Sequence, residues 1–307
     1  MTPYQINIKK IFSENSGKDV PQILCWFIEK IIRASEMNKF LAGAGYGKFG
    51  ADFANAVLQD FLQLNIEIIG DLPPKGGRYC FAANHPFGGI DGLILLKTIG
   101  DYYEGKVNIL LNSLLASLPG LAPIAVPVNI TGKSRGAAER SINQINSAFN
   151  SDNQVIILPA GKCSRSIDGM IQDDKWKPTF VKEAINTKRS IVPMYFEGGN
   201  SKNFYSFARF CRRLSTILNK PGLDDLPMIF LPKEMLKMHG SKITLVIGEP
   251  IDPQSLQIQK EIEEKSNLQL AQSIRDDVYM LRKNIGVKNL IWIQKNHRPQ
   301  FLLRLFL

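Results

Sequence analysis

From residue 65 onward, short runs of β-branched and aromatic residues alternate with amphipathic helical patterns. The candidate strands are 66–69, 79–83, 108–111, 124–128, 154–159, 190–196 and 242–248, and the candidate helices are 88–100, 136–150, 177–188 and 254–284. Strands separated by helices form parallel pairs, because the chain must cross over a face of the sheet to return. The alternation therefore predicts an α/β fold with a mixed, mostly parallel sheet flanked by helices.

Helical patterns also precede the first candidate strand, at 20–42 and 50–64, and each predicts one amphipathic helix. We therefore expect an N-terminal helical extension over 1–64, an α/β domain over 65–250 and a C-terminal helical tail over 251–307. This tail is rich in basic and aromatic residues.

The segment from Gly45 to Gly50 fits the pattern G-x-G-x-x-G. In a dinucleotide-binding unit this loop follows a strand, whereas here a helix precedes it and no ribose-binding acid is evident downstream. A turn between two helices is the favoured interpretation.

Residues 107–130 carry no charge and are numerous enough to cross a bilayer as a helix. Pro119, Pro123 and Pro127 argue against a helix, because each would remove a hydrogen bond within it. We expect a buried strand, an apolar loop and a second strand. The first residues of the chain lack the apolar run of a signal peptide, and the four cysteines are widely spaced, which favours reduced thiols in a cytoplasmic protein.

The 38 Lys and Arg residues exceed the 28 Asp and Glu residues and give a formal net charge of +10. Such a surface attracts nucleic acid, acidic phospholipid, a nucleotide or an acidic carrier protein. Zinc-finger spacing and Arg/Gly-rich tracts are missing from the sequence, so we do not expect nucleic acid as a partner.

The residues most suited to chemistry lie between 81 and 92. Asn84 and His85 follow an apolar strand, and Asp91 lies at the start of an apolar helix. A carboxylate that holds the Nδ1 hydrogen of an imidazole leaves Nε2 free to accept a proton, which makes the pair a general base. Since no Ser or Cys nucleophile is adjacent, the base would activate a substrate hydroxyl or amine for attack on an acyl group. The alternative is that Asp91 only caps the helix.

The stretch from Asn84 to Asp91 resembles the first block of the glycerolipid (lysophospholipid) acyltransferase family, the PlsC-like enzymes. This sequence has five residues between His85 and Asp91 where the family usually has four, as in the hemolysin-like, lyso-ornithine-lipid or glycine-lipid O-acyltransferase branch. The resemblance implies an acyltransferase-like fold and catalytic roles for His85 and Asp91. We also expect Gly88 and Gly89 to help stabilise the oxyanion.

Residues 155–165 resemble the third block of the family, Phe-Pro-Glu-Gly-x-x-Arg, which binds the acidic group of the acceptor. Ala160 replaces the usual Glu, which admits a carboxylate-bearing aminolipid as readily as a phosphate. The resemblance implies a substrate-binding set, made up of Asn84, Gly88, Gly89, Gly161, Lys162, Ser164 and Arg165.

Two weaker blocks lie beside these. Residues 124–129 resemble the second block but lack its Arg, for which Lys133 or Arg135 would substitute. Residues 191–194 resemble the fourth block, which walls the acyl site, and fit an ordinary core strand equally well.

Other reactive residues have simpler interpretations. Cys163 is a less favoured alternative nucleophile, and His239 and His297 are expected at the surface. Asp168, Asp173 and Asp174 lack the spacing of a calcium loop and predict a solvated turn. Residues 202–220 and the basic-aromatic tail fit interfacial segments, or else aromatic side chains packed on the core with cations in solvent.

These patterns predict an enzyme of membrane lipid synthesis, an acyltransferase resembling 1-acylglycerol-3-phosphate or lyso-aminolipid O-acyltransferases. It would bind peripherally to the inner face of the cytoplasmic membrane and move a fatty acyl group to the hydroxyl of a lysolipid. The donor would be a thioester of acyl carrier protein or coenzyme A, with no permanently bound cofactor and no metal. The alternatives are N-acylation of an amino acid and a non-catalytic lipid-binding scaffold. The acceptor head group, the acyl donor and the oligomeric state stay open.

Overall fold

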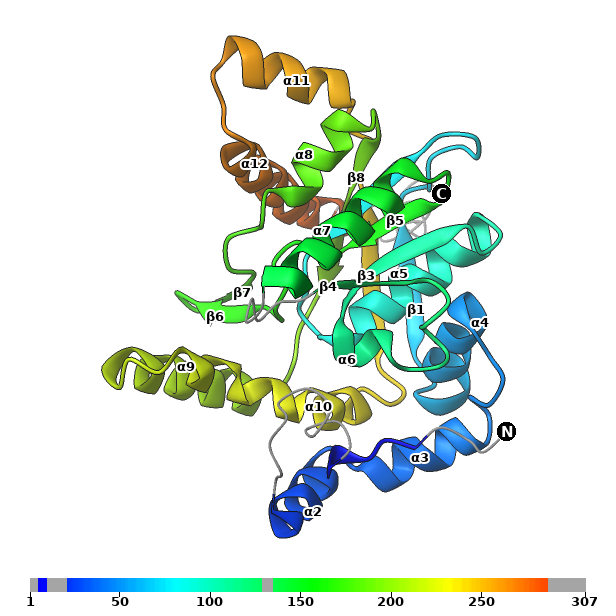
Figure 1. Ribbon diagram of the computed structural model, residues 1–307, viewed down its shortest axis with the longest axis vertical. Coiled ribbons are helices and arrows are strands. Elements are labelled where there is room, and N and C mark those ends of the chain that lie inside the picture. Colours follow the sequence, from blue (N-terminus) through cyan, green and yellow to red (C-terminus); the bar gives the residue numbers. More distant parts are fainter. Residues whose placement is uncertain (1–4, 10–20, 129–134, 287–307) are drawn as a thin grey trace, which may run out of the picture.

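The computed structural model describes residues 5–9, 21–128 and 135–286 (Figure 1). In these ranges seven strands form one sheet in the order β1-β9-β8-β2-β5-β3-β4. The strands are β1 (Asn65–Ile69), β2 (Tyr79–Ala83), β3 (Val107–Asn112), β4 (Ala125–Val128), β5 (Gln154–Ile157), β8 (Ser190–Glu197) and β9 (Lys242–Ile247). Neighbours are parallel except for the β8–β9 pair. The predicted mixed, mostly parallel sheet is confirmed.

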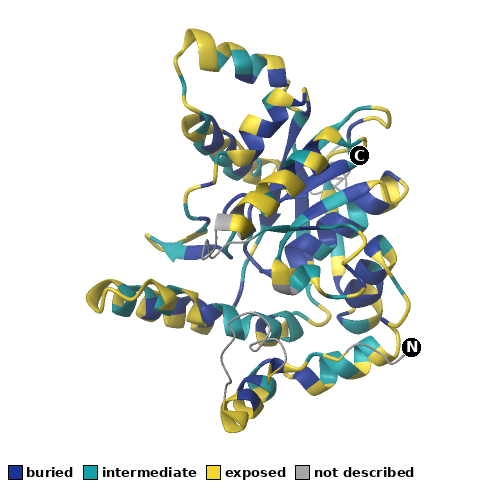
Figure 2. Cartoon of the chain, viewed as in Figure 1, coloured by how far each residue is buried: buried dark blue, intermediate teal, exposed yellow. Residues whose placement is uncertain are grey.

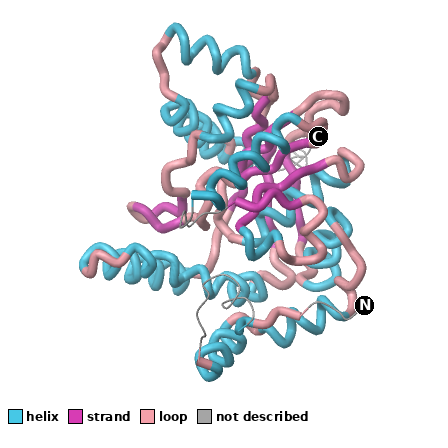
Figure 3. The backbone as a smooth tube through the Cα atoms, viewed as in Figure 1, coloured by secondary structure: helices cyan, strands magenta, loops and turns pink. Residues whose placement is uncertain are grey.

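Helices surround this sheet, and Figure 3 shows the strands gathered in the middle of the molecule. They are α2 (Gln22–Ile31), α3 (Ala34–Ala42), α4 (Gly50–Asn55), the π-helix η1 (Ala56–Phe61), α5 (Gly89–Tyr102), α6 (Ser113–Ala116), α7 (Arg135–Asn150), α8 (Thr179–Asn186), α9 (Lys202–Ile217), the 3-10 helix η2 (Pro221–Phe230), α10 (Leu231–Lys237), α11 (Pro253–Ile262) and α12 (Asn267–Met280). In the described ranges, every helix falls short of the length and hydropathy that a membrane span requires.

The hydrophobic core lies on both faces of the sheet, and the central strands are largely buried (Figure 2). Successive side chains of a strand point to opposite faces. In β2, Phe81 and Ala83 therefore join a cluster with α4, η1 and α5. Cys80 and Ala82 join a second cluster, which includes side chains of α7, α8, α11 and α12.

The N-terminal helices differ from the expectation in one respect. A single helix over 20–42 is wrong, because Arg33 adopts a left-handed backbone conformation (φ 54°) and separates α2 from α3. Helices α4 and η1 continue one another, and Phe53, Val57 and Leu58 pack in the main core. The glycine-containing segment 45–50 begins in the turn between α3 and α4, as predicted.

The uncharged segment after residue 107 forms β3, the short helix α6, a run of turns and β4, which confirms the predicted strand, loop and strand up to residue 128. Residues 129 and 130 lie outside the described ranges. The helical pattern 254–284 forms two helices, α11 and α12. The sequence did not predict α10, η2 or the hairpin of β6 (Arg165–Ile167) and β7 (Met170–Gln172), whose strands are only three residues long.

The connections of β2 and β5 place the site. Strand β2 leads through α5 to β3, and its neighbour β5 leads through α8 to β8 on the other side of β2. Because the two connections leave in opposite directions over opposite faces, a crevice opens beyond the carboxyl ends of these strands. The segments around residues 84–91 and 158–165 both lie there.

Candidate active site

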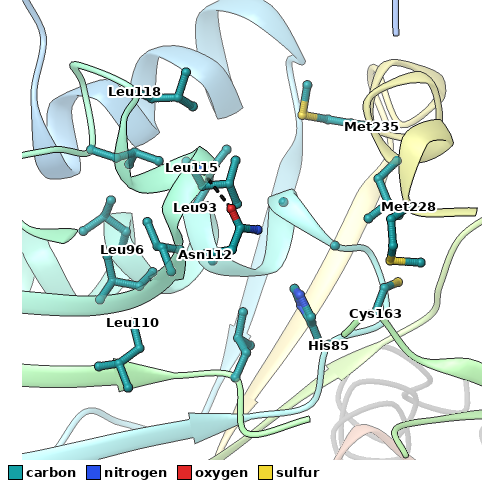
Figure 4. Close-up of a pocket in the computed structure, with 18 of the residues that line it drawn as sticks. His85, Leu93, Leu96, Leu110, Asn112, Leu115, Leu118, Cys163, Met228 and Met235 are labelled. Carbon is teal, nitrogen blue, oxygen red and sulfur yellow. Dashed lines mark hydrogen bonds between the residues drawn. The ribbon is translucent and has the colours of Figure 1, made fainter. Parts of the chain in front are cut away.

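His85 and Asp91 form a hydrogen-bonded pair at the end of β2. The Nδ1 atom of His85 lies 2.7 Å from Oδ2 of Asp91. The Asp91 side chain is fully buried, while that of His85 is 16% exposed and lines a cavity (Figure 4). A carboxylate accepts hydrogen bonds, so Nδ1 carries the hydrogen and Nε2 is left to accept a proton. The arrangement suits a general base.

Asp91 also holds the loop that precedes α5. Its carboxylate accepts hydrogen bonds from the backbone N–H groups of Phe87 (3.0 Å) and Gly88 (2.9 Å). Burial raises the pKa of Asp91, and the hydrogen bonds from His85 and Phe87 act in the opposite direction. The carboxylate thus caps α5 and orients His85 at the same time, so the two interpretations of Asp91 are compatible.

Asn84 lies away from the cavity. Its side-chain amide donates to the carbonyl of Phe196 (3.0 Å) and accepts from the N–H of Phe196 (2.7 Å), and the residue is buried. This reciprocal pair fixes the end of β2 to β8. We expected Asn84 to bind substrate. In the structure, both polar atoms of its amide are instead bonded to the backbone of Phe196.

Asp173 is a buried carboxylate rather than part of a solvated turn, so that expectation is wrong. It accepts hydrogen bonds from the backbone N–H of His85 (3.1 Å), the hydroxyl of Ser164 (2.5 Å) and the indole of Trp176 (2.8 Å). Burial raises the pKa of Asp173. The sequence did not indicate that Asp173 supports the backbone of His85, because the two residues lie 88 positions apart in the chain.

Helix α12 supports this loop from the outer side. The backbone N–H of Asp173 donates to the hydroxyl of Tyr279 (2.7 Å), and the guanidinium of Arg275 donates to the carbonyl of Asp173 (2.7 Å). Helix α12 is therefore connected to the backbone of His85 through Asp173.

Asp168 and Asp174 lie closer to the surface. Asp168 occupies the turn of the β6–β7 hairpin, and Asp174 forms an ion pair with Arg212 (2.7 Å).

The cavity next to His85 has a volume of about 630 Å³ and a largely apolar lining (Figure 4). This volume is typical of a small-molecule site. The N-terminal helices contribute Met37, Phe40, Leu41, Phe53, Val57 and Phe61 to the wall. The sequence patterns indicated helices there but gave no sign that they line the site. The charged or hydroxyl-bearing part of the wall, apart from His85, is formed by Lys162, Lys177, Thr179 and Asp225.

The predicted anion-binding residues fall into two groups, one that lines the cavity and one that is buried outside its wall. Gly161 and Lys162 line the cavity, and the ammonium group of Lys162 forms ion pairs with Asp225 and Asp224. Ser164 and Arg165 are buried outside the cavity wall. Ser164 donates to Asp173, and Arg165 donates to the carbonyls of Cys163 (2.8 Å) and Asp224 (3.2 Å). These two side chains bind protein groups in this structure, which differs from the expected contact with the acceptor.

Gly88 and Gly89 have different roles. Gly88 has a φ of 84°, and a Cβ atom there would lie 2.9 Å from a methyl carbon of Leu231, so glycine is required. Its N–H is bound to Asp91 and is not free for an oxyanion. The N–H of Gly89, at the first turn of α5, donates to no group in the described part of the chain, and the space beside Gly89 is open. A helix N-terminus favours negative charge, so the N–H of Gly89 is better placed than that of Gly88 to donate to an anion.

The thiol of Cys163 is buried and donates to the carbonyl of Pro86 (3.3 Å). Burial raises the pKa of Cys163 well above its ordinary value, so the thiol is neutral and unsuited to attack. His239 is exposed, as expected, and His297 lies outside the described residues.

Residues 191–194 lie in β8 and are not part of the cavity wall, which fits the core-strand interpretation. Lys133 lies outside the described residues, as does the side chain of Arg135. Among the described residues, no cluster of three or more His, Cys, Asp or Glu side chains is arranged to hold a metal ion.

Comparisons with known proteins show the family of the chain. A family model described as Acyltransferase matches residues 18–289. A lyso-glycine lipid O-acyltransferase of Phocaeicola vulgatus is 38% identical over 282 residues, 91% of this chain and 95% of the relative. A lyso-glycine lipid O-acyltransferase of Bacteroides thetaiotaomicron is 37% identical over 282 residues, 91% of this chain and 98% of the relative.

A solved structure, the 1-acyl-sn-glycerophosphate (LPA) acyltransferase PlsC from Thermotoga maritima, is 16% identical with a TM-score of 0.44, covering 92% of this chain and 87% of that chain. The family match extends on both sides of residues 65–250 and includes the cavity-lining N-terminal helices as well as α11 and α12. Because this match spans most of the chain and both relatives align with nearly all of it, the chain belongs to the acyltransferase family.

Proposed function

We propose that this enzyme transfers a fatty acyl group from an acyl thioester to the hydroxyl of a monoacylated glycine lipid. The observation that carries the proposal is the His85–Asp91 pair, whose imidazole lines a largely apolar cavity. The activity in the names of both relatives supports the choice of acceptor.

The chemistry of the acceptor follows from glycine itself. Glycine has an amino group and a carboxyl group but no hydroxyl, so O-acylation requires a hydroxyl on the first acyl chain. When that chain is attached through the nitrogen, the carboxylate stays free. The acceptor then combines an apolar chain, a hydroxyl and one negative charge, which match the apolar wall, His85 and the lysines of the cavity.

The transfer begins with proton removal by His85. Its Nε2 atom takes the proton of the acceptor hydroxyl as the oxygen attacks the thioester carbonyl, and Asp91 stabilises the imidazolium that forms. The backbone N–H of Gly89 stabilises the oxyanion of the tetrahedral intermediate. The carbon–sulfur bond then breaks, the ester is released, and the thiolate recovers the proton from His85.

The donor is proposed to be a thioester of acyl carrier protein or coenzyme A, and no cofactor is permanently bound. We propose direct transfer to the acceptor, because the thiol of Cys163 is buried and neutral and is therefore a poor nucleophile. A covalent acyl-enzyme is therefore not part of the proposal.

We also propose that the enzyme acts at the inner face of the cytoplasmic membrane. Helix α2 exposes Ile23, Leu24, Trp26 and Phe27, with Ile23 69% exposed. Large contiguous apolar patches of this kind mark interaction surfaces. Helix α2 contacts η2, which in turn packs on α9, so α2 and α9 lie on the same side of the molecule (Figure 1).

The test is an assay that crosses palmitoyl-acyl carrier protein and palmitoyl-coenzyme A with three acceptors: a hydroxyacyl-glycine, lysophosphatidic acid and free glycine. We expect transfer to the hydroxyacyl-glycine and a loss of at least about a thousandfold in the His85→Ala variant. Turnover near the wild-type level in this variant, with the fold intact by circular dichroism, would contradict the mechanism. Acylation of free glycine instead would favour the N-acyltransferase alternative.

A further inference from the structure

We propose that Lys177 binds the carboxylate of the lysolipid acceptor and determines the preference for a singly charged acidic head group. This inference rests on the proposed function, which it extends by assigning the residue that recognises the head group. Lys177 is outside every motif singled out in the sequence.

The charges of the cavity wall point to this residue. The described wall contains two lysines, Lys162 and Lys177. Lys162 is neutralised by its ion pairs with Asp224 and Asp225. Lys177 has no side-chain ion pair or hydrogen bond within the described part of the chain, so it contributes the unpaired positive charge of the wall.

The backbone places Lys177 firmly beside the site. Its N–H donates to the carbonyl of Pro159, directly after β5 (3.1 Å). The preceding residue, Trp176, is fully buried and donates to Asp173, which also binds the backbone N–H of His85. The same buried carboxylate therefore binds the backbone of His85 and the indole of the residue before Lys177.

The ammonium group lies over the backbone of Gly161. A Cβ atom at Gly161 would lie 3.1 Å from Nζ of Lys177, and Gly161 has a φ of 68°. Glycine thus leaves room for the ammonium at the cavity wall. Thr179, two residues after Lys177, also lines the cavity and can donate a hydroxyl hydrogen bond to the same anion.

The balance of charge favours a carboxylate over a phosphate. A carboxylate has one negative charge, which one free ammonium compensates, whereas a phosphate monoester carries about 1.5 to 2 at neutral pH. With Lys162 already paired to acids, the described wall lacks a second free cation for the additional charge.

The experiment measures binding of non-reacting probes to the full-length protein. N-palmitoylglycine lacks the acceptor hydroxyl, and N-palmitoylglycinamide also lacks the negative charge. Wild-type protein should bind the acid about ten- to a hundredfold more tightly than the amide. In Lys177→Gln this preference should disappear, while Lys177→Arg should keep most of it. Lys175→Gln is the matched control, because Lys175 lies two residues earlier and is exposed as Lys177 is, but does not line the cavity.

The outcomes separate this inference from the proposed function. An acid-over-amide preference that survives in Lys177→Gln overturns the inference, even if the enzyme acylates the lysolipid. A preference that depends on Lys177 supports the inference even if no acyl transfer to a glycine lipid is found, which would instead overturn the proposed function. Stronger Lys177-dependent binding of lysophosphatidic acid than of N-palmitoylglycine would contradict the preference for a carboxylate.

Discussion

At the scale of single residues, the imidazole of His85 is held on one side and free on the other. Asp91 binds Nδ1, and the side chain of His85 lines the cavity. Replacement of Asp91 by Asn should keep the cap of α5, because the amide oxygen still accepts from Phe87 and Gly88. It should lose the negative charge that stabilises the imidazolium of His85, because an amide group is neutral. We expect kcat/KM to fall about 10³- to 10⁴-fold in Asp91→Asn.

The pH dependence of Asp91 gives this prediction a second measurement. Burial raises the pKa of Asp91, so its carboxylate gains a proton at a higher pH than an exposed Asp does. Wild-type kcat/KM should therefore fall as the pH decreases through this raised pKa. Stability should change in the opposite direction, since a raised pKa means that the folded state binds the proton more tightly, and this contribution is lost as the pH rises.

Thermal melts at several pH values check the sign of this effect. The melting temperature of wild type relative to Asp91→Asn should decrease as the pH rises through the folded-state pKa of Asp91. A difference that increases with pH, or kcat/KM in Asp91→Asn close to that of wild type, would contradict the assigned role.

At the scale of elements, the segment after β5 is held by one buried carboxylate. Asp173 joins the backbone of His85 to Ser164 and Trp176, and α12 supports Asp173 from outside. In Asp173→Asn, the side-chain amide group would lose at least one of these acceptor positions. We expect kcat to fall about ten- to a hundredfold, because a small displacement of the base is costly, while the KM for the acceptor changes little.

The neighbouring variant Asp174→Asn is the control for this prediction. Asp174 is partly exposed and pairs with Arg212 on α9, so its kinetics should match those of wild type. Equal effects of the two substitutions, or an effect of Asp173→Asn on the acceptor KM alone, would show that Asp173 does not position His85.

The same elements show what the sequence could and could not predict. His85 and Asp91 are close in the chain, so their spacing around a turn was enough to predict their pairing. The partners of Asp173 include Tyr279, which lies 106 residues away, and no local pattern reports such a contact. Ser164 and Arg165 were expected to contact the ligand, but the direction of their side chains depends on the packing of the β6–β7 hairpin and η2.

At the scale of the whole molecule, cations without acidic partners in the described ranges gather on and just after α9. Helix α9 extends away from the sheet (Figure 1). By helical spacing, Lys202, Arg209 and Arg213 share one side of α9, and Lys220 follows just beyond its end. None of these four has an acidic partner in the described residues. Phe210 (60% exposed) and Ile217 (77% exposed) lie on the same helix. In the tail, Arg282 pairs with Glu197 (3.1 Å), and the residues from 287 onward lie outside the described ranges.

A helix with exposed cations next to exposed apolar side chains is suited to an anionic bilayer surface. Each cation near such a surface contributes about 1 kcal/mol, so the double variant Arg209→Gln/Arg213→Gln should lose about 2 kcal/mol, near thirtyfold, in binding to vesicles that contain an anionic phospholipid. The double variant Lys182→Gln/Lys260→Gln, on α8 and α11, is the control and should bind as wild type does. Raising the salt concentration should reduce the difference between α9 variant and wild type, because exposed charges are screened. Unchanged vesicle binding in the α9 variant, together with a raised KM for palmitoyl-acyl carrier protein, would instead assign this surface to the acidic carrier.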